Sequence, residues 1–163
     1  MHRNDVTIAK HFIKATKDII NTMAFMTPEE GKPFVKTRTP QDGDISSVIG
    51  VTGMCKGTIS VSFERKAARA LLEGMLGDDI QDEQQDMEDC VGEISNMISG
   101  QARASLDADG LNLQGSTPTI ITGDGHSIHH KASGPVIAIP FTLGPGAFTV
   151  EFCFDAPQDP KKA

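Results

Sequence analysis

Cysteine is scarce in this chain of 163 residues. The three cysteines, Cys55, Cys90 and Cys153, are widely spaced and form no Cys-x-x-Cys pair. An odd, scattered set of this kind predicts neither a disulfide framework nor a zinc knuckle. We therefore expect three buried thiols in a protein of the reducing cytoplasm.

Positive charge is also in short supply. The chain has 15 Lys and Arg against 22 Asp and Glu, a formal net charge of -7, and its basic residues form no run. Phosphate backbones are bound chiefly by clustered Lys and Arg. The composition thus argues against a nucleic-acid partner and favours a protein or a small molecule.

Long uninterrupted hydrophobic runs are missing as well. The longest stretch without a charge, residues 132–150, contains Pro135, Pro140 and Pro145 together with several glycines, so it predicts strands and turns instead of a membrane span. Lysines within residues 10–17 interrupt any signal-peptide core near the N-terminus. We expect no export and no membrane segment.

The length and the 38% hydrophobic content predict one domain with a single sizeable core. We place this domain at residues 1–155 and expect a flexible tail over residues 156–163.

Three segments carry apolar residues three and four positions apart, the spacing of an amphipathic helix. They predict helices over about residues 5–26, 64–77 and 87–107. Asp86 is placed to cap the third helix, and the acidic run 78–88 before it is interpreted as a solvated linker.

The remaining segments predict strands. Alternating apolar residues predict a hairpin over residues 45–63, and residues 136–141 and 147–154 predict a second hairpin around a Gly-Pro-Gly turn. Residues 111–114 and 119–122 are short strand candidates, and residues 27–44 predict a loop or irregular strand.

Two pairs of segments within the chain weakly resemble each other. Asp18-x-x-Asn21 in the first helix resembles Glu93-x-x-Asn96 in the third, and residues 57–63 resemble residues 146–152. We predict a two-layer α+β fold in which helices cover one face of a mostly antiparallel sheet, built from two quasi-repeated halves related by a pseudo-twofold axis.

One row of residues on the third helix faces away from the buried stripe. It consists of Asp89, Glu93, Asn96, Gly100 and Arg103, separated by four and three positions. A carboxylate accepts from a cation, and an amide both donates and accepts, which suits it to hold a water molecule against an electrophile that a partner supplies. Periodicity alone favours the simpler interpretation of Glu93 and Asn96 as two polar residues on a solvated helix face.

Residues 89–100, DCVGEISNMISG, followed by residues 116–123, STPTIITG, resemble the signature of the CheC/CheX/FliY phosphatases of bacterial chemotaxis. That signature is an acid or Ser, then E-x-x-N, a nearby Gly, and a proline after a spacer. Residues 11–15, HFIKA, and 20–23, INTM, are similar to its CheX branch.

The resemblance implies dephosphorylation of the aspartyl phosphate in a response-regulator receiver domain, of the type that signals to the flagellar motor. Glu93 would pair with a lysine of the receiver, Asn96 would orient the attacking water, and Asp89 and Gly100 would contact the partner. It implies no cofactor or metal of the chain's own, since Mg²⁺ belongs to the receiver. It also implies a homodimer formed by pairing sheet edges, which hides exposed strands.

Other interpretations stay open. The same fold could dock on a receiver, adaptor or flagellar switch protein without hydrolysis, or hold a small molecule between helices and sheet. Asp18 and Asn21 are interpreted as the inactive remnant of a second site, because Lys14 and Lys17 lie within a turn of Asp18. The histidines at positions 126, 129 and 130 are interpreted as a polar loop, since they lack the pattern of a metal site.

Overall fold

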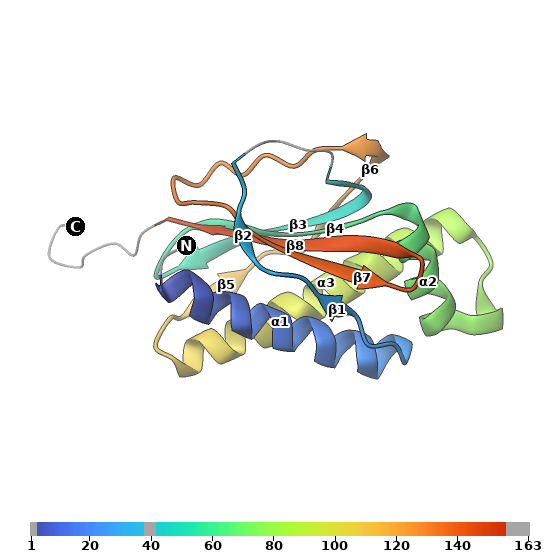
Figure 1. Cartoon of the computed structure of the whole chain (residues 1–163), viewed down its shortest axis with the longest axis horizontal. Helices are drawn as coiled ribbons and strands as arrows, with labels where there is room; N and C mark the ends of the chain where they lie inside the picture. Colours follow the sequence, from blue (N-terminus) through green and yellow to red (C-terminus); the bar gives the residue numbers. More distant parts are fainter. Residues whose placement is uncertain (1–2, 38–41, 156–163) are drawn as a thin grey trace, which may run out of the picture.

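The computed structural model describes residues 3–37 and 42–155 of the chain. In this part of the chain, three α-helices pack on one face of an eight-stranded sheet (Figure 1). The helices are α1 (Arg3–Ala24), α2 (Arg65–Leu76) and α3 (Glu83–Ala108), and a 3-10 turn, η1 (Gly77–Asp79), follows α2. The predicted arrangement of helices on one face of the sheet is therefore confirmed.

All strand pairs in the sheet are antiparallel. The strands are β1 (Glu29–Glu30), β2 (Phe34–Val35), β3 (Gly43–Gly53), β4 (Gly57–Phe63), β5 (Leu113–Gly115), β6 (Thr119–His126), β7 (Ile137–Leu143) and β8 (Gly146–Phe154). Their order is β1-β7-β8-β4-β3-β5, with β2 also paired to β7 and β6 also paired to β3. The hairpins β3–β4 and β7–β8 thus meet at the centre of the sheet.

The two halves of the chain are related by a pseudo-twofold axis at this centre. The internal sequence resemblance aligns Gly57 with Gly146, so it also aligns Val61 with Val150, and these two valines lie directly opposite each other in the β4–β8 pair. Exchanging the halves then exchanges β3 with β7 and leaves the strand order unchanged. The predicted repetition is confirmed at the level of topology.

Aromatic side chains fill the space between the sheet and the helices. Phe12 of α1 stacks on Phe152 of β8 with ring centroids 5.1 Å apart, and Phe148 stacks between Phe63 and Phe141. Each of these rings is almost fully buried. These rings stabilise the domain in two ways, because their apolar surface is removed from water and because the stacked rings attract one another. All three cysteines are free and buried, as expected.

The second face of the sheet is different in character. Side chains alternate between the faces of a strand, and on β4 the residues opposite the core are Thr58, Ser60 and Ser62. The connection after β6 and the described residues next to β3 lie on this face, and the helices lie on the other (Figure 1). The polar cluster described below lies under these segments.

The start of the third helix corrects one prediction. Residues 78–88 are not a linker, because α3 begins at Glu83 and the cap is Asp82, whose carboxylate accepts a hydrogen bond from the Gln85 backbone N–H at 3.2 Å. Asp86 lies inside the first turn and accepts from the backbone N–H of Gln81 at 2.9 Å. The apolar period begins only at Met87, so the polar first turn carried no periodic signal.

Other boundaries also differ. Strand β6 extends four residues beyond the predicted end at residue 122. Residues 27–44, predicted as a loop or irregular strand, contain the two short strands β1 and β2. The predicted tail, residues 156–163, lies outside the described residues, so the boundary at residue 155 stays a prediction. Among the described residues, no helix is long and apolar enough to span a bilayer.

Candidate functional site

Helix α3 presents the predicted outward row to solvent. Its buried side is formed by residues three and four positions apart, among them Met87, Ile94 and Ile98, which fix the rotation of the helix against the sheet. Glu93 and Asn96 lie on the opposite side and are both exposed. They stand three residues apart, so their side chains are neighbours on the helix surface.

Neither of these two side chains is used internally. Among the described residues, no hydrogen bond or ion pair engages the Glu93 carboxylate or the Asn96 amide. Burial raises the pKa of the neighbouring Cys90 thiol to about 11, and the charges of Glu93, Asp86 and Asp89 add to this effect. The row therefore offers a negative field and a free amide to an approaching surface.

Gly100 leaves the next turn of the row open. A Cβ added at this position would meet no atom within 4 Å. Glycine in the interior of a helix costs about 1 kcal/mol relative to alanine, and no internal contact of Gly100 requires that cost. Gly92 on the same helix differs, because a Cβ there would lie 3.3 Å from Ile120. The opening at Gly100 thus faces outward.

The two ends of the row are engaged within the chain. Asp89 is exposed and accepts a hydrogen bond from the Gln85 amide at 2.9 Å. Arg103 is half-buried and donates to the Ser99 hydroxyl at 3.1 Å, with its guanidinium beside Gly115 of β5. The freely accessible part of the row is consequently Glu93, Asn96 and Gly100.

The acid–amide pair of the first half has internal partners. Asp18 accepts hydrogen bonds from Lys14 at 2.6 Å and from Gln101 at 3.0 Å, and these bonds hold its carboxyl pKa below the ordinary value. The Asn21 amide donates to the Thr27 hydroxyl at 3.1 Å. Four residues after Asn21 the chain carries Phe25, where the second half carries Gly100. The two pairs are therefore not equivalent in this fold.

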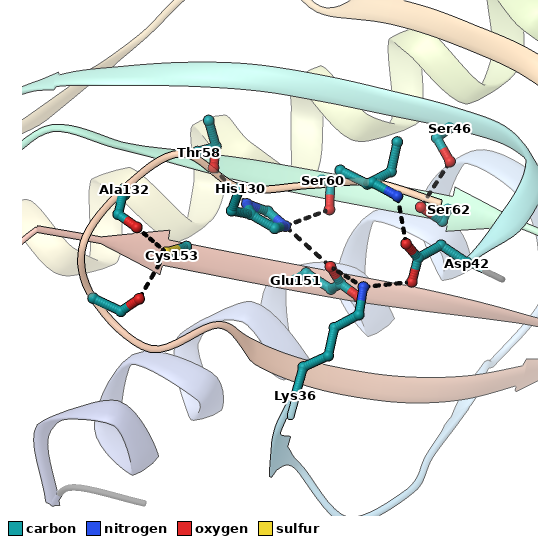
Figure 2. Close-up of polar contacts among 12 residues, drawn as sticks. Lys36, Asp42, Ser46, Thr58, Ser60, Ser62, His130, Ala132, Glu151 and Cys153 are labelled. Carbon is teal, nitrogen blue, oxygen red and sulfur yellow. Dashed lines mark hydrogen bonds and ion pairs between the residues drawn. The ribbon is translucent and has the colours of Figure 1, made fainter. Parts of the chain in front are cut away.

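A second polar cluster lies on the loop-covered face of the sheet (Figure 2). The Lys36 ammonium donates to Asp42 at 2.7 Å and to Glu151 at 3.0 Å, and a ring nitrogen of His130 lies 3.0 Å from the same Glu151 carboxylate. All four side chains are at most 7% exposed. A partner surface cannot reach them, so we interpret this cluster as structural.

Charge balance explains why the cluster is stable. Burial alone would lower the pKa of Lys36, but hydrogen bonds and the charges of Asp42 and Glu151 outweigh it and leave the pKa above its ordinary value. The Asp42 carboxylate also accepts from the Ile128 backbone N–H at 2.6 Å. These contacts fasten both covering segments to β8 (Figure 2).

The interpretation of the histidines as a polar loop is wrong for His126, which is part of β6 and lies 2.5 Å from the Ser46 hydroxyl. His129 and His130 lie in the connection after β6. His129 is exposed, but the side chain of His130 is 1% exposed and also contacts the Thr58 hydroxyl at 2.5 Å. Within the described ranges no group of His, Cys, Asp and Glu residues is arranged to hold a metal ion.

A cavity of about 850 Å³ lies between the start of α1 and the end of α3. Ile8, Leu106, Phe152 and Phe154 line its apolar part, and Cys55 borders it. No residue of the outward row contributes to its lining. A pocket between helices and sheet therefore exists, but it is separate from Glu93 and Asn96.

Residues 45–142 match the family model described as "Chemotaxis phosphatase CheX". The chain is 24% identical over 140 residues to the CheY-P phosphatase CheX of Thermotoga maritima, an alignment that covers 85% of this chain and 89% of the relative. The matched residues include the whole of α3.

Solved structures share the fold. A chemotaxis protein CheX from Desulfovibrio desulfuricans is 52% identical, with a TM-score of 0.87 and coverage of 91% of this chain and 99% of that one. The CheX–CheY–BeF3–Mg²⁺ complex from Borrelia burgdorferi contains a chain that is 20% identical, with a TM-score of 0.73 and coverage of 91% and 97%. The latter likeness shows the fold alone.

Proposed function

The chain belongs to the CheX family of chemotaxis phosphatases, and on this premise we propose that it hydrolyses the aspartyl phosphate of a CheY-type receiver domain. The observation that carries the proposal is the exposed pair of Glu93 and Asn96, which has no partner among the described residues and lies beside the open Gly100. The Thermotoga relative bears the name CheY-P phosphatase, which supports the same substrate class.

The proposed role of Asn96 is to orient the attacking water. Phosphoryl transfer requires positioning of the nucleophile in line with the leaving oxygen and stabilisation of spreading charge, and little covalent help. An amide is not a useful general base. Its oxygen accepts from a water molecule while its N–H₂ donates to a phosphoryl oxygen, so one inserted side chain fixes the direction of attack.

The proposed role of Glu93 is to anchor the complex. Its carboxylate would pair with the lysine of the receiver's active site, and the spacing of three residues would then place Asn96 over the phosphoryl group. A charge-assisted pair formed at the centre of an interface, where water is excluded, contributes more than an exposed pair on a free surface. We propose that Gly100 and Asp89 lie at the margin of this contact.

The receiver would supply the remaining chemistry. We propose that it holds the Mg²⁺ that neutralises the developing charge, and that the chain itself contributes no cofactor. We further propose a cytoplasmic homodimer formed by pairing of sheet edges. The outer edge of β6 suits this role, because β6 pairs with β3 alone within the described ranges and half of its residues are exposed.

A non-catalytic docking module is the competing function. The assay that separates the two measures release of phosphate from a purified phosphorylated receiver with Mg²⁺, with and without the protein, and in parallel measures binding of the two proteins. The proposal expects faster release that scales with the amount of protein. Binding without acceleration of release by any cognate receiver would leave the docking module and reject the phosphatase.

A further inference from the structure

Phe25 combines two locally unfavourable features. Among the described residues it is the one residue other than glycine with positive φ, at 56°, and its side chain is 84% exposed. A bulky side chain is disfavoured in the left-handed region, and an exposed aromatic ring does not gain the stabilisation that its burial would give. Strain of this kind is concentrated at functional sites.

The turn at this position has a structural purpose that does not need an aromatic ring. The Phe25 N–H donates to the Asn21 carbonyl at 3.1 Å and ends α1. The turn directs Met26 back against the core, while Ala24 packs closely on Gly74 of α2. Glycine or asparagine adopts this conformation at lower cost. The fold therefore explains the turn but not the phenylalanine.

The packing of α1 against α3 places Phe25 at the level of the outward row. The two helices are antiparallel, because His11 of α1 contacts Asp109 and Asp18 contacts Gln101 of α3. The step from His11 to Asp18 along α1 corresponds to the step from Asp109 to Gln101 along α3. A further step of the same length leads from Asp18 to Phe25 and from Gln101 to Glu93. Phe25 directly follows the last residue of α1, so this step places it near the level of Glu93 on α3.

The flank of α3 that faces α1 also borders the row. Glu93, Met97 and Gln101 follow one another at intervals of four residues, so they stack along one side of the helix. Gln101 holds Asp18 of α1, Met97 is partly exposed, and Glu93 is exposed. The outward row and the end of α1 therefore belong to the same helical layer, on the same side of the sheet (Figure 1).

We propose that Phe25 is a docking anchor for the phosphorylated receiver, whose surface would bury the ring while Glu93 and Asn96 reach the active site. The proposal rests on the proposed function and adds a residue outside the acid–amide pair. A preformed, exposed aromatic ring loses little side-chain entropy on binding, and aromatic anchors at interface centres carry much of the binding energy. The strained turn holds the ring away from the core before the receiver arrives.

The test compares Phe25→Asn with Phe34→Ala in steady-state phosphate release from the phosphorylated receiver, together with thermal unfolding of each variant. Asparagine tolerates the left-handed turn, and Phe34 is a second exposed phenylalanine, located on β2 at the sheet edge. We expect Phe25→Asn to raise KM by about tenfold with kcat within twofold of the wild type and with no loss of Tm. Phe25→Tyr should restore most of the affinity, and Phe34→Ala should leave KM unchanged.

The outcomes separate the two proposals. If the wild type does not accelerate phosphate release, the proposed function fails before Phe25 is tested. If the wild type is active and Phe25→Asn keeps the same KM, the anchor is rejected. A higher KM accompanied by a fall in Tm would also overturn the proposal, because it would assign Phe25 to the stability of the turn.

Discussion

Asp18 of α1 accepts a hydrogen bond from Gln101 of α3 at 3.0 Å, and Gln101 directly follows Gly100, the open position of the outward row. This contact binds the acid of the first half to the helix that carries the second pair. The carboxylate of Glu93, in contrast, has no such partner among the described residues. One half of the repeated fold therefore supports helix packing and the other half presents its polar pair to solvent.

Replacement of Gly100 by alanine should separate stability from function. Alanine should raise the free energy of unfolding by about 1 kcal/mol, since its Cβ meets no atom within 4 Å. The same methyl group should hold the receiver away from α3, and a displacement of about 1 Å at a reacting centre costs up to about 100-fold in rate. Urea unfolding and kcat/KM for the phosphorylated receiver measure the two effects. An unchanged kcat/KM would remove Gly100 from the interface.

Replacement of Glu93 by glutamine tests the charged anchor. The side chain keeps its shape but loses the charge that would pair with the receiver's lysine, so we expect kcat/KM to fall by roughly 10- to 100-fold and its salt dependence to weaken. Asp78→Asn is the matched control, because this carboxylate is exposed on η1 and no hydrogen bond or ion pair engages it among the described residues. Equal effects of the two variants would indicate general charge steering instead of a specific pair.

The Lys36 cluster should be a major contributor to stability. Lys36→Met leaves the carboxylates of Asp42 and Glu151 buried without their cation, which we expect to cost about 3–5 kcal/mol of unfolding free energy. Lys17→Met removes the half-exposed pair with Glu30 and should cost under about 1 kcal/mol. Urea unfolding of both variants checks the difference. If both variants lost less than about 1 kcal/mol of unfolding free energy, water would have access to the Lys36 cluster.

Asp44 should make stability depend on acidic pH. Its carboxylate accepts from the backbone N–H groups of Gly125 at 2.9 Å and Arg65 at 2.8 Å, and these bonds hold its pKa below the ordinary value of 3.8. The stabilisation is therefore complete above about pH 4 and is lost as the pH falls through the lower folded pKa. Near neutral pH we expect Asp44→Asn to lower the free energy of unfolding by about 1 kcal/mol. The difference in Tm between wild type and this variant should then become smaller below pH 4. A constant difference would contradict this linkage.

The outward row was predictable because it depends only on helical period. Glu93, Asn96 and Gly100 belong to one long helix, and the apolar stripe buried on one side of it determines which residues face solvent. The topology was likewise predictable from the two hairpins and from the two internal sequence resemblances. The resemblance of residues 57–63 to 146–152 corresponds in the structure to the pairing of Val61 with Val150. These features are local, or they repeat at a fixed offset, so the sequence alone contains their signal.

The buried cluster had no such signal. Lys36, Asp42, His130 and Glu151 come from distant segments and meet only after the sheet has formed. Each of them alone is typical of a solvated position. The exposure of Phe25 has no signal in the sequence either, because it depends on the left-handed turn that ends α1.

Comparison of Asn96→Ala with Asn21→Ala shows which half of the repeated fold carries the proposed phosphatase activity. Both variants remove an exposed amide from the same kind of acid-x-x-Asn pair, and one measures initial rates of phosphate release from a phosphorylated receiver with Mg²⁺, together with the affinity of each variant for that receiver. We expect Asn96→Ala to lose most of the acceleration, about 100-fold or more, while it still binds, and Asn21→Ala to keep the wild-type rate. Full activity of Asn96→Ala, or loss of activity in Asn21→Ala instead, would contradict the proposed role of Asn96.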